Sequence, residues 1–280
     1  MMKSTNTITN HFFKNQIHFL KENFNITDHE LFQKFSIAVE RFCYFVLEMD
    51  KLIDGEYDLG EQYKNHDNKI YHLISNHQKA LQLLWDVFPA DHQFWKDLDE
   101  TNFRYYEILI KEKWVSKERS VLNIDDFKEY AIAKHCLAYI PIKGLCYLFE
   151  AKVESEKLEE VFTKIFLGMQ MNDDIEDFNN DLINYQWTYA HSRVQEIMEE
   201  NNIQENQDLD KFRERVLYVS GVGEELIGYC KESFLSAKEL SKEYHLTALE
   251  NWLNETLSII CENEKLVLEL LQMNSDASHS

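Results

Sequence analysis

In the stretch Gly168-Met-Gln-Met-Asn-Asp-Asp-Ile-Glu-Asp-Phe-Asn-Asn-Asp181, the residues Asp173, Asp177 and Asp181 stand four positions apart. On an α-helix, side chains at this spacing share one face. The apolar run 161–171 just before them predicts that the helix, expected over residues 154–182, is mainly buried. Three carboxylates on one face of a buried helix repel one another unless a cation lies between them, so the stretch predicts a cation-binding face.

A second acidic set lies upstream in Phe45-Val-Leu-Glu-Met-Asp-Lys-Leu-Ile-Asp-Gly-Glu-Tyr-Asp58, where Asp50, Asp54 and Asp58 again stand four apart. Charge runs usually form solvated helix faces, and such faces favour Glu because Asp is a poor helix former. Two aspartate sets with one spacing, both beside apolar runs, therefore indicate a site between two helices. Carboxylate oxygens are ligands of Mg²⁺, which also binds substrate phosphates, so the site is expected to hold a phosphate-rich substrate.

The composition favours one all-α helical bundle. The 280 residues include 44% hydrophobic residues but only 7 Gly and 2 Pro, so few residues interrupt helices. We expect a single domain over residues 1–280, with its core at about 28–272 and a disordered tail at 273–280. Pro141 and Gly144 are expected to kink one helix, and residues 220–223 to break another. The expected helices cover about 9–23, 28–53, 66–88, 91–114, 123–150, 154–182, 189–199, 208–239 and 244–272.

The net charge and the cysteines indicate which partners and which cellular compartment to expect. The formal net charge of −21 argues against a nucleic-acid partner, whose phosphates the chain would repel. The five cysteines form no CxxC pair, which predicts free thiols in a reducing, cytoplasmic compartment. The first ten residues contain no apolar signal core, and no run of about 18 apolar residues predicts a membrane span.

Both acidic stretches resemble motifs of the class I isoprenoid synthases. Gln170-Met-Asn-Asp-Asp-Ile-Glu-Asp177 resembles the second aspartate-rich motif of trans-isoprenyl diphosphate synthases. Asp177-Phe-Asn-Asn-Asp181 resembles the second DxxxD of squalene and phytoene synthases, and Asp50-Lys-Leu-Ile-Asp54 is similar to their first. The resemblance extends over residues 28–272 and implies the helical fold of that superfamily.

The resemblance implies a role for each matching residue, and a homodimer. Two or three Mg²⁺ ions would be held by aspartates, with Gln170 lining the cavity below a prenyl diphosphate. Lys134 falls where prenyl synthases place a lysine that contacts substrate, and Arg193 and Arg104 are further candidates for the diphosphate. Trp187 and Tyr189 follow the second motif closely enough to cover the site. The expected metal ligands are Asp50, Asp54, Asp173, Asp174, Asp177 and Asp181, of which Asp50, Asp54, Asp173 and Asp177 are also the expected catalytic residues.

The departures from these motifs leave more than one activity open. The first motif lacks a doubled aspartate and the Arg-Arg pair that usually follows it, which disfavours chain elongation. The leading expectation is a terpene synthase that ionises a prenyl diphosphate, releases diphosphate and cyclises the carbocation. The alternative is a prenyltransferase that couples two isoprenoid units, of the squalene/phytoene or the chain-elongating type. A non-catalytic helical partner subunit and a metal-dependent hydrolase are the less favoured alternatives.

Overall fold

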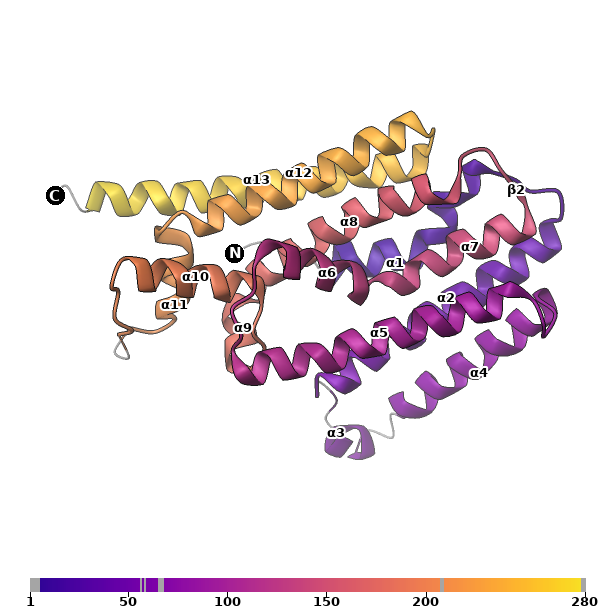
Figure 1. Ribbon diagram of the computed structural model, residues 1–280, viewed down its shortest axis with the longest axis horizontal. Coiled ribbons are helices and arrows are strands. Elements are labelled where there is room, and N and C mark those ends of the chain that lie inside the picture. Colours follow the sequence, from indigo (N-terminus) through magenta and orange to yellow (C-terminus); the bar gives the residue numbers. More distant parts are fainter. Residues whose placement is uncertain (1–5, 56, 58, 65–67, 207–208, 278–280) are drawn as a thin grey trace.

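The chain folds as an all-helical bundle, apart from one two-residue strand pair (Figure 1). The structure is a computed structural model, and it describes residues 6–55, 57, 59–64, 68–206 and 209–277. The helices are α1 (Asn6–Leu20), η1 (Lys21–Asn23), α2 (His29–Ile53), α3 (Leu59–Lys64), α4 (Lys69–Val87), α5 (Gln93–Glu118), α6 (Ile124–Lys134), η2 (Cys136–Ala138), α7 (Tyr139–Leu148), α8 (Ser155–Glu176), α9 (Phe178–Ile183), α10 (Tyr189–Glu200), α11 (Phe212–Val219), α12 (Val222–Glu243) and α13 (Thr247–Ala277).

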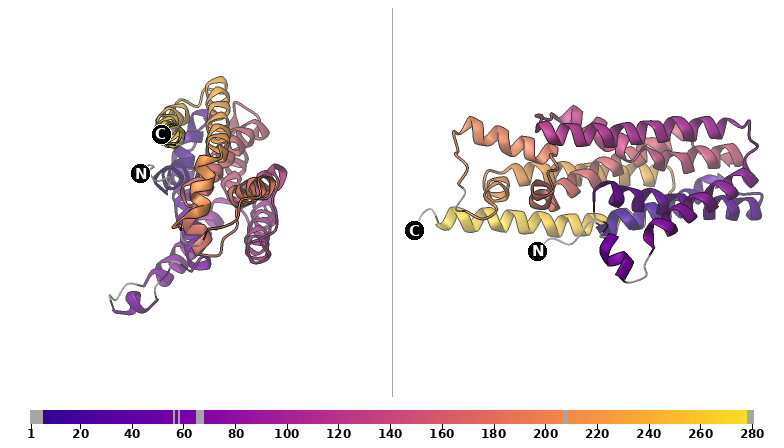
Figure 2. Two further views of the ribbon diagram at one scale, coloured as in Figure 1. Left: turned by 90° about the vertical axis from the view of Figure 1, so that its left-hand side faces the viewer. Right: turned by 90° about the horizontal axis from the view of Figure 1, so that it is seen from below.

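The long helices run side by side along one axis, as Figures 1 and 2 show. The most extensive packing is between α2 and α4, between α8 and α12, and between α12 and α13. Helix α3 projects from the bundle in both views of Figure 2. None of the helices in the described parts of the chain combines the length and the apolar character that crossing a membrane requires.

Local capping explains several helix starts. The Asp28 side chain accepts a hydrogen bond from the Leu31 N–H at 3.0 Å and so begins α2. Asn123 and Asp126 form a reciprocal capping box that begins α6. Both starts fall close to the positions that the sequence predicts, because a cap depends only on neighbouring residues.

The expected helix over 123–150 is wrong in where it breaks. The chain leaves the α-helix at His135 and passes through η2 into α7. Pro141 lies in the first turn of α7, where its missing N–H costs no intrahelical hydrogen bond. Gly144 permits a close approach instead of a kink, since a Cβ there would lie 2.2 Å from Cζ of Phe35.

The expected helix over 154–182 is also interrupted. Helix α8 ends at Glu176, and α9 begins at Phe178 after Asp177. The Asp177 N–H nevertheless donates to the Asp173 carbonyl at 2.9 Å, and the Asp181 N–H to the Asp177 carbonyl at 2.8 Å. The helical stacking of the three aspartates therefore continues across the interruption.

The structure also differs from the sequence-based expectation at a short strand pair and at the C-terminal end, and it agrees at residues 220–223. Phe24–Asn25 pairs with Glu150–Ala151 as an antiparallel strand pair that the sequence does not predict. The expected break at 220–223 is confirmed, with Gly221 at φ 86° between α11 and α12. Helix α13 continues to Ala277, into the stretch expected to be disordered. Asp58, the expected helix starts His66 and Asp208, and residues 278–280 of the expected tail lie outside the described residues.

Candidate functional site

Six of the seven aspartates in the two acidic stretches line one cavity of about 720 Å³, and the seventh, Asp58, lies outside the described residues. Asp50 comes from the last turns of α2, and Asp54 is the residue that caps this helix. The other aspartates come from the end of α8, from Asp177 between the two helices, and from α9. The structure thus brings together residues roughly 120 positions apart in the sequence. The aspartates that line the cavity are Asp50, Asp54, Asp173, Asp174, Asp177 and Asp181.

The remainder of the cavity wall is largely apolar. Helix α2 contributes Phe35, Val39 and Phe42, and further rings and aliphatic groups come from α1, α5, α7 and α8. Phe35 and Phe94 are fully buried and meet edge to face, with ring centroids 6.4 Å apart. A cavity with acidic side chains and a large apolar wall suits a ligand that carries an apolar chain and a head group bound through cations.

Burial gives the carboxyl groups of α8 and α9 unusual acid–base properties. It raises the pKa of Asp173 to about 7 and that of Asp174 to about 8, and neighbouring carboxylates add to both shifts. Burial also raises the pKa of Asp181 to about 9, again with its acidic neighbours. Gln170 donates an amide hydrogen bond to Asp174 at 2.8 Å, which partly stabilises its charged form. Without a cation, these groups hold protons at a pH where free carboxyls have lost them.

The oxygen donors fit a hard divalent cation, although they are not assembled into a finished site. Within the described ranges, no three His, Cys, Asp or Glu side chains are grouped as ligands for one ion. The aspartates instead come from two separate segments around the cavity. Mg²⁺ commonly keeps several waters and uses only one or two carboxylates together with ligand phosphates. The donor set therefore fits Mg²⁺ that arrives with a phosphorylated ligand.

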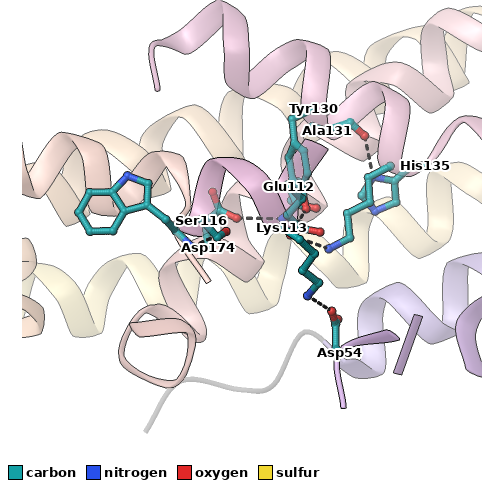
Figure 3. A network of polar contacts seen from close by, with 11 residues as sticks. Asp54, Glu112, Lys113, Ser116, Tyr130, Ala131, His135 and Asp174 are labelled. Carbon is teal, nitrogen blue, oxygen red and sulfur yellow. Dashed lines mark hydrogen bonds and ion pairs between the residues drawn. The ribbon is translucent and has the colours of Figure 1, made fainter. Parts of the chain in front are cut away.

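Lys134 lines the cavity together with these carboxylates. Its Nζ is 3.7 Å from Oε1 of Glu112. The same oxygen accepts a hydrogen bond from the Tyr130 hydroxyl, and Figure 3 shows Glu112 beside Tyr130. Burial opposes the charge on Lys134, but Glu112, Tyr130 and Asp50 together hold its pKa well above its usual range. Lys134 therefore carries a positive charge at the wall of the cavity.

Two charged residues of α5, Glu112 and Lys113, pair with charged residues of the cavity, and the sequence gives no signal for either. Glu112 lines the cavity as the partner of Lys134. Lys113 reaches Asp54, with its Nζ 2.5 Å from Oδ1, as Figure 3 shows. Both stand in the ordinary charged run Lys111-Glu-Lys113, where neither spacing nor composition indicates a site.

Four residues predicted at the site do not line the cavity. Arg193 donates to Glu225 at 3.0 Å and also pairs with Glu196, while Arg104 lies exposed on α5. Neither arginine therefore lies in the wall of the cavity, where the expected contact with a diphosphate would be made. Trp187 and Tyr189 are both buried in the protein instead of covering the cavity.

The segment after α9 is fixed to the bundle through Trp187. The Trp187 N–H donates to Oγ of Ser116 at 2.9 Å, and its indole N–H donates to Oγ of Ser192 at 3.0 Å. The residues on either side, Gln186 and Thr188, line the cavity. Trp187 thus anchors part of the cavity wall without contacting the cavity itself.

His191 provides a second anchor for α9. Its Nε2 lies 2.8 Å from the carbonyl of Phe178, and its Nδ1 accepts the Thr188 N–H at 3.0 Å. These contacts define a neutral ring that donates through Nε2. Burial, together with the positive charges of Arg213 and Arg119, lowers the pKa of His191 to about 4. The ring ties the first residue of α9 to the segment that follows this helix.

The five cysteines are free thiols, as the sequence predicts. Cys43 also lines the cavity, but burial raises its pKa to about 12, so it is not a nucleophile at neutral pH.

Comparison of the whole chain with known protein families, with curated proteins and with solved structures gives no match in any of the three. The resemblance to isoprenoid synthases therefore stays a prediction from the motifs.

Proposed function

We propose that this protein is a Mg²⁺-dependent enzyme of the class I isoprenoid synthase type, which ionises a prenyl diphosphate and cyclises the resulting carbocation. The observation that carries this proposal is one cavity with six aspartates and Lys134 in its wall and a large apolar surface beside them. A diphosphate head group needs cations, and an isoprenoid chain needs apolar surroundings. The same cavity offers both.

The acidic residues act on the head group. Asp50 and Asp54 on one side, and Asp173, Asp177 and Asp181 on the other, would hold Mg²⁺. Bound Mg²⁺ supplies charge neutralisation for the departing diphosphate. Lys134 adds a fixed positive charge whose position is held by Glu112.

The apolar wall acts on the chain. Phe13, Phe35, Phe42, Phe94 and Tyr105 line the cavity and exclude water from the carbocation. An aromatic face contributes about 0.5–2 kcal/mol to a cation placed over it. No side chain is assigned as a general base, and the released diphosphate is the base that we favour. Coupling of two isoprenoid units remains the alternative within the same class.

The test is incubation with geranyl, farnesyl and geranylgeranyl diphosphates and Mg²⁺, with and without isopentenyl diphosphate. A hydrocarbon or alcohol formed from one substrate alone supports cyclisation, whereas a longer diphosphate indicates elongation. A C30 or C40 hydrocarbon assembled from two identical units indicates coupling. Mass spectrometry of organic extracts distinguishes these products.

Two variants connect the reaction to the cavity. Asp177→Asn is expected to abolish product while leaving the helical circular dichroism spectrum unchanged. Asp91→Asn, at an exposed turn before α5, is the matched control and should retain full activity. Binding of Mg²⁺ and diphosphate without any product would favour the non-catalytic partner, and release of monophosphate would favour the hydrolase. Full activity of Asp177→Asn would exclude the site as assigned.

A further inference from the structure

Asp54 already has a cationic partner in this structure. The Nζ of Lys113 lies 2.5 Å from Oδ1 of Asp54, and the two side chains are 41% and 19% exposed. Asp54 lines the cavity, whereas Lys113 does not. Lys113 reaches Asp54 from α5, as Figure 3 shows. The ion pair therefore connects the end of α2 to a helix that supplies none of the predicted metal ligands.

A carboxylate oxygen that holds an ammonium group at this distance is not free to coordinate a metal. An arriving divalent ion must therefore displace Lys113 or use the other oxygen against the repulsion of a neighbouring positive charge. Displacement is feasible, because pairs with this much exposure contribute little to stability. The freed ammonium group would then need a new anionic partner nearby.

We propose that Lys113 is a resident counter-ion of Asp54 that competes with the divalent metal, and that an anionic head group favours metal binding by accepting the displaced lysine. This inference rests on the proposed function. The competition makes metal and anion binding cooperative. An anion that stabilises the displaced Lys113 must raise the affinity of the protein for the metal, and the metal must raise its affinity for the anion by the same factor. In the absence of an anionic ligand, the pair holds the metal affinity low.

The same helix supplies a matched control. Lys111 lies two residues before Lys113 and pairs with Glu129 at 3.3 Å, where the two side chains are 52% and 61% exposed. Neither residue lines the cavity. Lys111→Gln and Lys113→Gln therefore remove the same charge from one helix, but only the second removes it from Asp54.

The experiment measures Mn²⁺ binding to the full-length protein by electron paramagnetic resonance, first alone and then with inorganic diphosphate, after correction for the soluble metal–diphosphate complex. Lys113→Gln is expected to bind Mn²⁺ alone about two- to fivefold more tightly than the wild type, the range set by a partly exposed ion pair. The enhancement by diphosphate should shrink by a similar factor. Lys113→Arg keeps the charge and, like Lys111→Gln, should match the wild type.

The failures of the two proposals are distinguishable. If the wild type binds Mn²⁺ but Lys113→Gln binds it no more tightly than Lys111→Gln does, the competition is excluded and the proposed function stands. If the wild type binds no Mn²⁺ even with diphosphate, both proposals are excluded. Circular dichroism and the melting temperature verify that each variant is folded before its affinity is compared.

Discussion

The backbone N–H of Asp181 donates to the Asp177 carbonyl at 2.8 Å, although α8 has already ended at Glu176. This bond preserves the one-turn spacing of the two carboxylates across the junction with α9. Both side chains consequently reach the cavity that Asp173 also lines. The short α9 acts as a continuation of the acidic face, held by His191 through the Phe178 carbonyl.

Asp181→Asn should stabilise the protein in the absence of divalent metal. Burial beside other acids raises the pKa of Asp181 to about 9, so at pH 8 the folded state bears the cost of keeping this carboxyl protonated. Asparagine has nearly the same shape and no charge. We expect the free energy of unfolding, measured with urea in EDTA at pH 8, to rise by about 1–3 kcal/mol. Mg²⁺ should then stabilise the variant less than it stabilises the wild type. A loss of stability relative to Asp91→Asn would contradict this account.

The stability of the metal-free protein should fall as the pH rises from about 5 to 9, most steeply just above about pH 6.5. The raised pKa values of Asp173, Asp174 and Asp181 contribute stability that is fully present below the ordinary pKa of an aspartate. This contribution is lost progressively as the pH rises from there, and the loss is complete when the pH has passed the folded-state pKa values of about 7 to 9. His135 and His191 have the opposite effect below about pH 6.5, where these two histidines offset part of the effect of the three aspartates. Burial lowers the pKa of each to about 4, so the unfolded chain takes up protons first as the pH falls from 6.5.

The measurement is a urea titration series from pH 4.5 to 9 in EDTA, repeated with Mg²⁺. Metal competes with protons for the aspartates, so Mg²⁺ should reduce the loss of stability above about pH 6.5 and have little effect near pH 4.5, where the folded protein keeps these carboxyls protonated. Stability that rises steadily from pH 6 to 9 in EDTA is the result that this assignment of charges does not permit.

Lys134 and Glu112 should be strongly coupled. Lys134→Met leaves Glu112 and the nearby Asp50 without a buried cation, and we expect a loss of about 3–5 kcal/mol in the free energy of unfolding. Adding Glu112→Gln should recover part of that loss, because the orphaned charge is then removed. A double-mutant cycle quantifies the coupling. The Lys111–Glu129 pair is the exposed control and should show about 0–1 kcal/mol of coupling. Additive losses at Lys134 and Glu112 would mean that the two do not act as a pair.

Gly144→Ala should destabilise the protein through the cavity wall. The new Cβ would lie 2.2 Å from Cζ of the buried Phe35, which lines the cavity, so the ring must move. The expected cost, measured by urea unfolding, is about 1–3 kcal/mol.

Gly228→Ala in α12 is the control, because no atom lies within 4 Å of the added Cβ. It should stabilise the protein by about 0.5–1 kcal/mol through helix propensity alone. Equal effects of the two substitutions would exclude the close approach to Phe35 as the cause.

The helices and the acidic spacing could be predicted from the sequence because both depend on residues within a few positions of one another. The helix start near Asp28, the break at Gly221 and the four-residue spacing of Asp173, Asp177 and Asp181 are all of this kind. Helix interruptions at His135 and Asp177 could not be predicted in this way. They depend on how helices that are distant in the sequence pack against each other.

The sequence by itself therefore determined that the chain is helical and that two of its helices carry acidic ends beside apolar runs. Only the tertiary structure decided that these ends share a cavity, that Arg193 pairs with Glu225 outside it, and that Glu112 and Lys113 supply the charges opposite Lys134 and Asp54. The physical reason is that a helical pattern specifies which face is buried through local geometry. Which charge meets that face is set by long-range packing, to which each residue contributes only a small part.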